Sequence, residues 1–149
     1  MTIFTTSRVF TAPPEAVFAA IAAPERLARW WGPDGFRNTF ETFDFKTGGL
    51  WRFTMHGPDG ANYPNESTFA SVVPNQSVVV KHLSQPHFDL TIRLAATASG
   101  TLVTWEQAFE SAEVAASVRH IVEPANEQNL SRWQAEVASD QDTRSEEHT

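Results

Sequence analysis

Residues 111–137 read SAEVAASVRHIVEPANEQNLSRWQAEV, and this stretch decides the fold. Its apolar residues recur at helical spacing, and Ser111 in front of them is a typical N-cap. Pro124 is expected to interrupt and kink the helix, because proline lacks the N–H that an interior position uses. The expected apolar stripe consists of Val114, Val118, Ile121, Val122, Leu130, Trp133 and Val137. One long C-terminal helix is therefore predicted, with an apolar face that needs a partner surface.

The partner surface is predicted upstream, where the apolar period from residue 39 to about 109 is two. Trp51, Phe53 and Met55 alternate with polar residues, which is typical of a half-buried strand. Glycines at 48–49 and 57–60 favour tight turns between antiparallel strands. Further strands are expected at about 62–72, 77–83, 87–96 and 101–109, and residues 3–10 form one more. The pattern predicts about six to seven strands in a meander.

Two short helices are predicted between the first strand and the meander. The first begins at Pro13-Pro14, since prolines are tolerated in a first turn. Pro24 ends it, a second helix covers 25–31, and Gly32-Pro33 ends that helix in turn.

The predicted fold class is α+β: a curved antiparallel sheet wrapped on one long C-terminal helix. A twisted sheet must cover one face, and this helix is the element long enough to do so. Residues 1–138 are expected to form one domain. Residues 139–149, SDQDTRSEEHT, contain no apolar side chain and are predicted to be a disordered polar tail.

Composition excludes several classes of function. The 18 Asp and Glu against 11 Lys and Arg give a net charge of −7, which would repel a nucleic acid. The absence of cysteine excludes disulfides, thiolate metal sites and a cysteine nucleophile. No apolar run is long enough to span a membrane, and the N-terminus lacks the pattern of an export signal, so a cytoplasmic location is expected. A homodimer is compatible with the sequence, although no residue specifies one.

Aromatic residues indicate a large dry interior. The chain has 11 Phe and 5 Trp but only 1 Tyr, so most of its aromatic surface carries no hydroxyl group. This composition suits an apolar core or the wall of a cavity.

Several short motifs, in order along the chain, resemble a known family. They are RVFTAPPEAVF at 8–18, WWGP at 30–33, GGLWRF at 48–53, HGPDG at 56–60 and YPN at 63–65. In this order and spacing they are similar to the START-like (SRPBCC) superfamily, specifically its AHSA-type branch, named for the activator of a heat-shock ATPase. The resemblance covers residues 3 to about 137.

The resemblance implies the helix-grip fold and a deep cavity between the sheet and the terminal helix. Members use this cavity for hydrophobic ligands, so the first hypothesis is a module that binds a small hydrophobic molecule. An enzyme of the cyclase, hydrolase or dehydratase kind, and a co-chaperone-like activator of a heat-shock ATPase, are the alternatives. No catalytic residue, cofactor or metal is assigned.

One departure from the family bears on the pocket. Members commonly carry Gly-Trp-Glu at the start of the last helical segment, where this chain has Ala125-Asn126-Glu127. The resemblance therefore implies that Asn126 replaces a bulky aromatic side chain, which makes the pocket larger and more polar at that end.

The candidate ligand-binding residues are those expected to face the space between sheet and helix, with Trp30 and Trp31 at the gate that the resemblance implies. They are Trp30, Trp31, Phe43, Trp51, Phe53, Met55, Phe69, His82, Phe88, Leu90, Trp105, Gln107, Val122, Asn126, Leu130 and Trp133.

Two polar residues in this set have an alternative, purely structural interpretation. His82 shares the inward side of its strand with Val78 and Val80, so it is either a structural histidine or a group that bonds a ligand or moves a proton. Gln107 lies on the inward side with Trp105, and its amide needs a partner there. That partner is a ligand, Asn126 or an ordered water.

Overall fold

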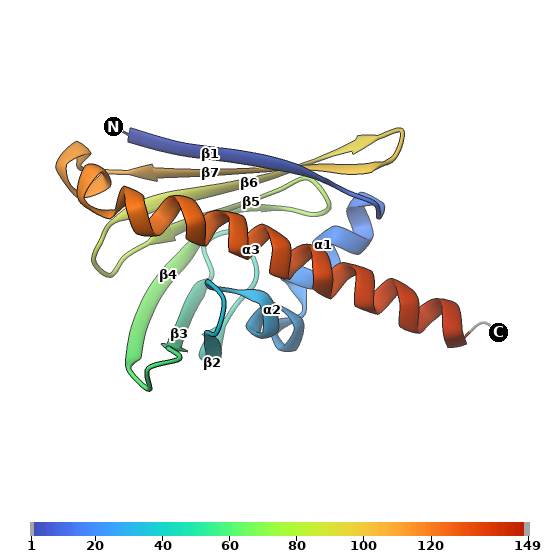
Figure 1. Ribbon diagram of the computed structural model, residues 1–149, viewed down its shortest axis with the longest axis horizontal. Helices are drawn as coiled ribbons and strands as arrows, with labels where there is room; N and C mark the ends of the chain where they lie inside the picture. Colours follow the sequence, from blue (N-terminus) through green and yellow to red (C-terminus); the bar gives the residue numbers. More distant parts are fainter. Residues whose placement is uncertain (1, 148–149) are drawn as a thin grey trace.

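The computed structural model describes residues 2–147, and the side chains of residues 2–139 (Figure 1). Within these residues the elements follow one another as β1 (Thr2–Phe10), α1 (Pro14–Ala22), α2 (Pro24–Trp30), β2 (Arg37–Phe43), β3 (Leu50–His56), β4 (Asn62–Val73), β5 (Ser77–His82), β6 (Phe88–Thr97), β7 (Gly100–Phe109) and α3 (Ala112–Glu147). The α+β class and the order of elements predicted from the sequence are confirmed.

The strands form one antiparallel sheet in the order β1-β7-β6-β5-β4-β3-β2. Strands β2 to β7 are a meander, and β1 joins it by pairing with the last strand, from Thr2 opposite Phe109 to Phe10 opposite Thr101. The sheet curves, and α3 lies along it from the turn after β7 past α1 and α2 (Figure 1). This is the helix-grip arrangement, with the first strand at the edge beside α3.

A bulge in β2 explains why its apolar residues do not follow a strict period of two. The register between β2 and β3 shifts between Phe40 and Thr42. The shift brings Phe40 and Phe43, three positions apart, into contact with ring centroids 5.5 Å apart. A bulged strand places two residues against one of its partner, so both rings pack on the core.

The buried face of α3 differs from the predicted stripe. Ile121 is 59% exposed and Val114 is 37% exposed. The inward positions include Ala115, Val118, Val122, Asn126, Asn129, Leu130, Trp133 and Val137, of which Val118 and Val122 are half-buried. Apart from the adjacent Asn129 and Leu130, these positions recur every three or four residues, and the exposed Ile121 and Val114 lie about 100° around the helix from the inward Val122 and Ala115. Including Ile121 and Val114 in the stripe was wrong.

The helix begins as predicted and continues through Pro124. Ser111 Oγ accepts a hydrogen bond from Val114 N at 3.3 Å, which caps the first turn. Pro124 lies inside α3 rather than interrupting it. Proline lacks the N–H that would bond the carbonyl of His120, four residues earlier. Because both residues are exposed, water can solvate that carbonyl.

The predicted disordered tail, residues 139–149, lies largely outside the residues whose side chains the structure describes, and its disorder stays a prediction. None of the helices within residues 2–147 combines the length and the apolar character needed to cross a membrane.

Candidate functional site

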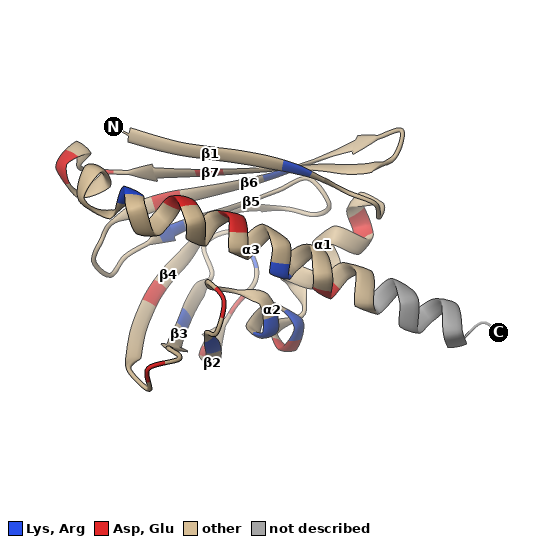
Figure 2. Ribbon diagram, in the orientation of Figure 1, with Lys and Arg blue, Asp and Glu red and all other residues tan. Residues whose placement is uncertain are grey.

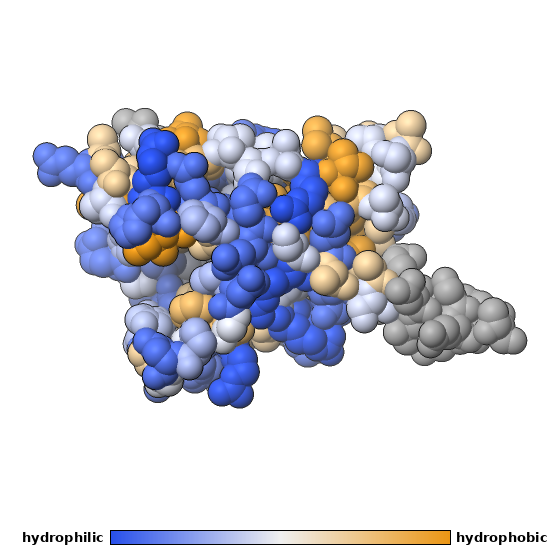
Figure 3. All heavy atoms as spheres, in the orientation of Figure 1, coloured by the Kyte–Doolittle hydropathy of each residue, from blue (hydrophilic) through white to orange (hydrophobic). Residues whose placement is uncertain are grey.

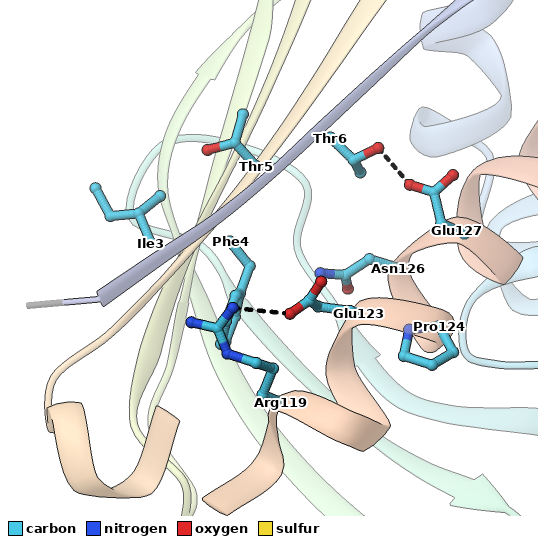
Figure 4. A pocket seen from close by; sticks show the side chains of 9 residues that line it. All are labelled: Ile3, Phe4, Thr5, Thr6, Arg119, Glu123, Pro124, Asn126 and Glu127. Carbon is cyan, nitrogen blue, oxygen red and sulfur yellow. Dashed lines mark hydrogen bonds and ion pairs between the residues drawn. The ribbon is translucent and has the colours of Figure 1, made fainter. Parts of the chain in front are cut away.

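A pocket of about 500 Å³ lies between β1 and the first half of α3 (Figure 4). Strand β1 contributes Ile3, Phe4, Thr5 and Thr6, and α3 contributes Arg119, Glu123, Pro124, Asn126 and Glu127. In Figure 4 the Asn126 amide points from α3 towards β1. Asn126 is only 6% exposed. The residue that the resemblance implies to replace a bulky aromatic side chain thus lies in the wall of this pocket.

Paired charges line part of the pocket. The Arg119 guanidinium lies 5.0 Å from the centroid of the Phe4 ring and 3.1 Å from Glu123 Oε1. Thr6 Oγ1 donates a hydrogen bond to Glu127, which also forms an ion pair with Arg8 at 3.1 Å. Figure 2 shows acidic and basic positions along α3 and a basic position on β1. Arg119 and Arg8 therefore each face a carboxylate.

Two buried polar atoms on β7, the strand that pairs with β1, have no hydrogen-bond partner among the described residues. Phe4 is directly opposite Gln107 on β7, and Thr6 is directly opposite Trp105. Opposed residues of antiparallel strands point to the same face, with Cα atoms about 4.5–5.5 Å apart. Gln107 Oε1 and Trp105 Nε1 are buried and have no hydrogen-bond partner among the described residues. The inner face of β7 next to the pocket thus carries one unused acceptor and one unused donor.

A third unpaired atom, Trp51 Nε1, lies on β3. The Trp31 ring lies against both orphaned indoles, with centroids 4.9 Å from Trp51 and 5.9 Å from Trp105. Trp31 also contacts Phe53, at 6.3 Å in an edge-to-face arrangement. Trp31 is half-buried. Through these contacts its side chain connects β3 with β7.

Trp30 and Trp133 differ from these residues in their hydrogen bonding. Their rings stack with centroids 4.8 Å apart and planes at 5°. Trp30 Nε1 donates to Ala20 O at 3.0 Å, and Trp133 Nε1 donates to Val17 O at 3.2 Å. Both N–H groups are satisfied by the backbone of α1.

His82 is buried and hydrogen-bonded through both ring nitrogens. Nδ1 lies 2.8 Å from Pro86 O, and Nε2 lies 2.7 Å from Asn65 Oδ1. Burial lowers the pKa of His82, an effect partly opposed by backbone hydrogen bonds to Pro86 and Ser84. The ring stacks on Phe88 at 4.4 Å, and both line a second pocket of about 230 Å³. The structure therefore places these two candidates apart from Asn126.

The remaining candidates line the interior rather than the pocket beside β1. Phe69, Leu90 and Leu130 are no more than 1% exposed, and Phe43 and Met55 are partly buried against the same core. Val122 packs in a smaller cluster that contains Phe4 and Phe109. Among all sixteen candidates, only Asn126 lines the pocket between β1 and α3.

Arg132 fixes the segment that carries Trp31. Its guanidinium donates hydrogen bonds to backbone carbonyls of Arg29 at 2.6 Å, Gly32 at 2.8 Å, Pro33 at 2.9 Å and Phe36 at 3.0 Å. Burial lowers the pKa of Arg132, and the charge of Asp34 opposes this. This connection between α3 and residues 29–36 holds Trp31 between the two orphaned indoles.

Sequence analysis missed Phe4, Thr6, Arg119 and Glu123. A signal for part of this set was available, because Arg119, Glu123 and Glu127 recur every four residues and so share one side of α3. The pairing of β1 with β7, which brings that side of the helix next to Phe4, is a tertiary feature that the helix pattern does not encode.

Within the described side chains, no group of three or more His, Asp or Glu lies close enough together to hold a metal ion.

A curved antiparallel sheet closed by a long C-terminal helix, with a pocket at the helix–sheet boundary, defines a helix-grip domain. Residues 11–138 match the family model described as activator of Hsp90 ATPase homolog 1-like protein. The chain belongs to this family. No curated protein sequence matches it.

Solved structures show the same fold. A protein from Nitrosomonas europaea is 18% identical with a TM-score of 0.86, and the match covers 93% of this chain and 96% of that one. A protein from Arthrobacter aurescens is 24% identical with a TM-score of 0.84, covering 92% and 86%. An AHSA1-like protein from Aeromonas hydrophila is 19% identical with a TM-score of 0.77, covering 93% of each chain.

Proposed function

We propose that this protein binds a small, largely apolar molecule between the sheet and α3, and that the molecule enters through the pocket beside β1. The observation that carries this proposal is the position of Gln107 Oε1 and Trp105 Nε1, buried without partners beside the residues that line that pocket. A buried polar group without a partner costs about 1–3 kcal/mol. A bound molecule that pairs with these atoms recovers that free energy.

The size of the pocket supports the same proposal, while six of its nine lining residues are polar or charged: Thr5, Thr6, Arg119, Glu123, Asn126 and Glu127. Ligand pockets usually have volumes of about 300–1,000 Å³ and combine apolar walls with a few placed polar groups. The pocket beside β1, at about 500 Å³, combines the Phe4 ring with the buried Asn126 amide.

The enzyme alternative receives less support from His82. A general base needs a proton to take from a substrate, and it is often oriented by a carboxylate. The hydrogen-bond partners of His82 are the Pro86 carbonyl, the Asn65 amide and the Ser84 hydroxyl, none of which is a carboxylate. These contacts are those of a structural histidine that holds the turn after β5.

A role in binding another protein would favour a continuous exposed apolar patch. The most exposed large apolar side chains among the described residues lie on different elements: Ile3 and Val9 on β1, Tyr63 on β4 and Ile121 on α3. Figure 3 shows a hydrophilic surface over the middle of α3, with apolar residues in separate patches. This distribution supports a small ligand more than a protein partner.

Binding of the neutral fluorescent dye Nile red tests the proposal. Asn126→Trp fills the pocket wall, and we expect it to weaken dye binding at least about tenfold, equivalent to 1.4 kcal/mol. Ile121→Trp is the matched control, because it adds the same side chain to the same helix at a position that is 59% exposed. It should leave the affinity within about twofold. Equal affinities for the two variants, with both folded by circular dichroism, would overturn the proposal.

A further inference from the structure

We infer that the natural ligand is an uncharged aromatic molecule that accepts a hydrogen bond from Trp105 Nε1 and donates one to Gln107 Oε1. This inference rests on the proposed function and specifies the chemistry of the molecule bound there.

The buried polar residues indicate that the ligand is uncharged. They are Ser67, His82, Thr101, Gln107, Asn126 and Asn129. None of the described Asp, Glu, Lys or Arg side chains is in this group. Moving an ion into such an interior without a counter-charge costs far more than moving a neutral polar group. The charged residues that line the pocket are each paired, Arg119 with Glu123 and Glu127 with Arg8, so they offer no free charge to an ionic ligand.

The indole of Trp105 requires an acceptor. An indole N–H can only donate, and that of Trp105 is buried in a side chain that is 2% exposed. The equally buried Trp30 and Trp133 show how this chain satisfies indoles elsewhere, since each bonds a backbone carbonyl of α1. No described group accepts a hydrogen bond from Trp105 Nε1. A carbonyl oxygen on the ligand would accept it.

Gln107 Oε1 requires a hydrogen-bond donor on the ligand. This oxygen is a buried acceptor without a partner, two residues beyond Trp105 on the same face of β7. Residues two apart on a strand are about 7 Å apart along it. A hydroxyl or N–H at roughly this distance from the ligand's carbonyl, across one aromatic ring, pairs both atoms at once.

Trp31 and the surrounding rings favour a flat aromatic body for the ligand. Trp31 contacts Trp51, Phe53 and Trp105, and aromatic rings pack well in stacked or edge-to-face contacts. Trp51 Nε1 is a second buried N–H without a partner among the described residues. The Trp51 ring contacts Trp31, as the Trp105 ring does. A ligand that extends past Trp31 would bond Trp51 Nε1 with a second oxygen.

Four small probes test the inference. They are para-hydroxyacetophenone, acetophenone without the hydroxyl, para-ethylphenol without the carbonyl, and the anion para-hydroxybenzoate. Each is titrated into isotope-labelled protein while the indole N–H signals are followed by NMR. We expect para-hydroxyacetophenone to bind at least about fivefold more tightly than each of the others, since one hydrogen bond contributes about 1 kcal/mol. The Trp105 signal should shift, while those of Trp30 and Trp133 stay in place.

Two variants assign the preferences to their residues. Gln107→Leu should abolish the preference for para-hydroxyacetophenone over acetophenone. Trp105→Phe should abolish the preference over para-ethylphenol. Retained Nile red binding shows that each variant keeps its pocket.

The outcomes separate the inference from the proposed function. Tightest binding of para-hydroxybenzoate, equal binding of the neutral probes, or no binding of any probe to protein that binds Nile red would overturn the inference alone. Failure of both the dye and the probes to bind would overturn both.

Discussion

Two pairs of tryptophans in this molecule are equally buried but differ in hydrogen bonding. Trp30 and Trp133, at 1% and 0% exposure, stack on each other and donate to carbonyls of α1. Trp51 and Trp105, at 1% and 2%, project from the sheet, and their N–H groups have no partner among the residues that the structure describes. Burial therefore does not distinguish the two pairs, whereas an account of hydrogen bonds does.

The same comparison divides α3 into two parts. Its second half places Leu130, Trp133 and Val137 in the main core. Its first half meets β1 through Asn126 and paired charges, and the pocket lies there. The second half of the helix packs in the main core, whereas the first half packs in a smaller apolar cluster and also borders the pocket at the edge of the sheet.

The largest expected effect on stability comes from removing one ring of the hydrogen-bonded pair, Trp30 and Trp133. Trp133→Ala deletes a fully buried ring that stacks on Trp30 and contacts Phe10 at 5.2 Å. We expect the free energy of unfolding to fall by about 3–5 kcal/mol, as for other buried aromatic residues. Urea unfolding measures it, with Ile121→Ala as a surface control that should change stability by less than about 1 kcal/mol. A similar small loss in both variants would mean that Trp133 is not a core residue.

Arg132→Met tests the connection that keeps Trp31 between the two pairs. Methionine retains much of the aliphatic stem but removes the donors to the carbonyls of Arg29, Gly32, Pro33 and Phe36. We expect a loss of about 2–3 kcal/mol, because hydrogen bonds to charged groups contribute more than neutral ones. Urea unfolding gives the loss, and increased mobility of the Trp31 indole signal by NMR locates it.

Arg132→Lys keeps the charge and lacks the planar fork of donors. It should restore only part of the stability lost in Arg132→Met. Full restoration would show that charge, rather than the set of carbonyl contacts, holds residues 29–36.

Replacing single indoles by phenyl rings makes the comparison between the pairs direct. Trp30→Phe removes an N–H that is paired with Ala20 O, whereas Trp105→Phe removes one that is unpaired. With similar losses of apolar area, Trp30→Phe should be more destabilising by about 1 kcal/mol, the net contribution of one hydrogen bond. Parallel urea curves measure the difference. Equal losses would indicate that Trp105 Nε1 has a partner in solution.

The smallest expected effect concerns His82, a buried polar group that is satisfied. Because burial lowers its pKa, the unfolded chain takes up a proton on this imidazole at a higher pH than the folded protein does. The stability that depends on neutral His82 is therefore present above about pH 6.5, the ordinary histidine pKa, and is lost as the pH falls towards the folded value.

Urea unfolding at pH 7.5 and 5.5 measures this loss, which His82→Gln should reduce. His120→Gln, which removes an exposed imidazole, is the matched control. An unchanged pH dependence in His82→Gln would show that other groups account for it.

Much of the fold was predictable, because local patterns and tertiary packing agree. Trp51 and Phe53 alternate with exposed Arg52, and the structure has a strand there. Ile121 shows the limit. Its apolar side chain suits a core, yet it is 59% exposed while the neighbouring Val122 is turned towards the sheet.

The pocket was less predictable than the fold. Asn126 was identified through a departure from family residues, but Thr6 and Glu127, whose side chains bond each other, lie at opposite ends of the sequence. The interior aromatic residues were predicted as a cavity wall. In the structure many of them contact one another, as Trp51 does Phe53 and Phe69 with centroids 4.3 and 5.5 Å apart. Hydrophobic type alone does not distinguish a ring that faces space from one that faces another ring.

The pairing of β1 with β7 has a consequence for biosynthesis. A ribosome releases the chain from its N-terminus, so the first strand emerges long before Phe109, the partner of Thr2, exists. Until then β1 has no neighbour in the sheet, and closing so long a loop is entropically costly. The pocket wall formed by Phe4 and Thr6 is therefore completed only when the last strand and α3 are available.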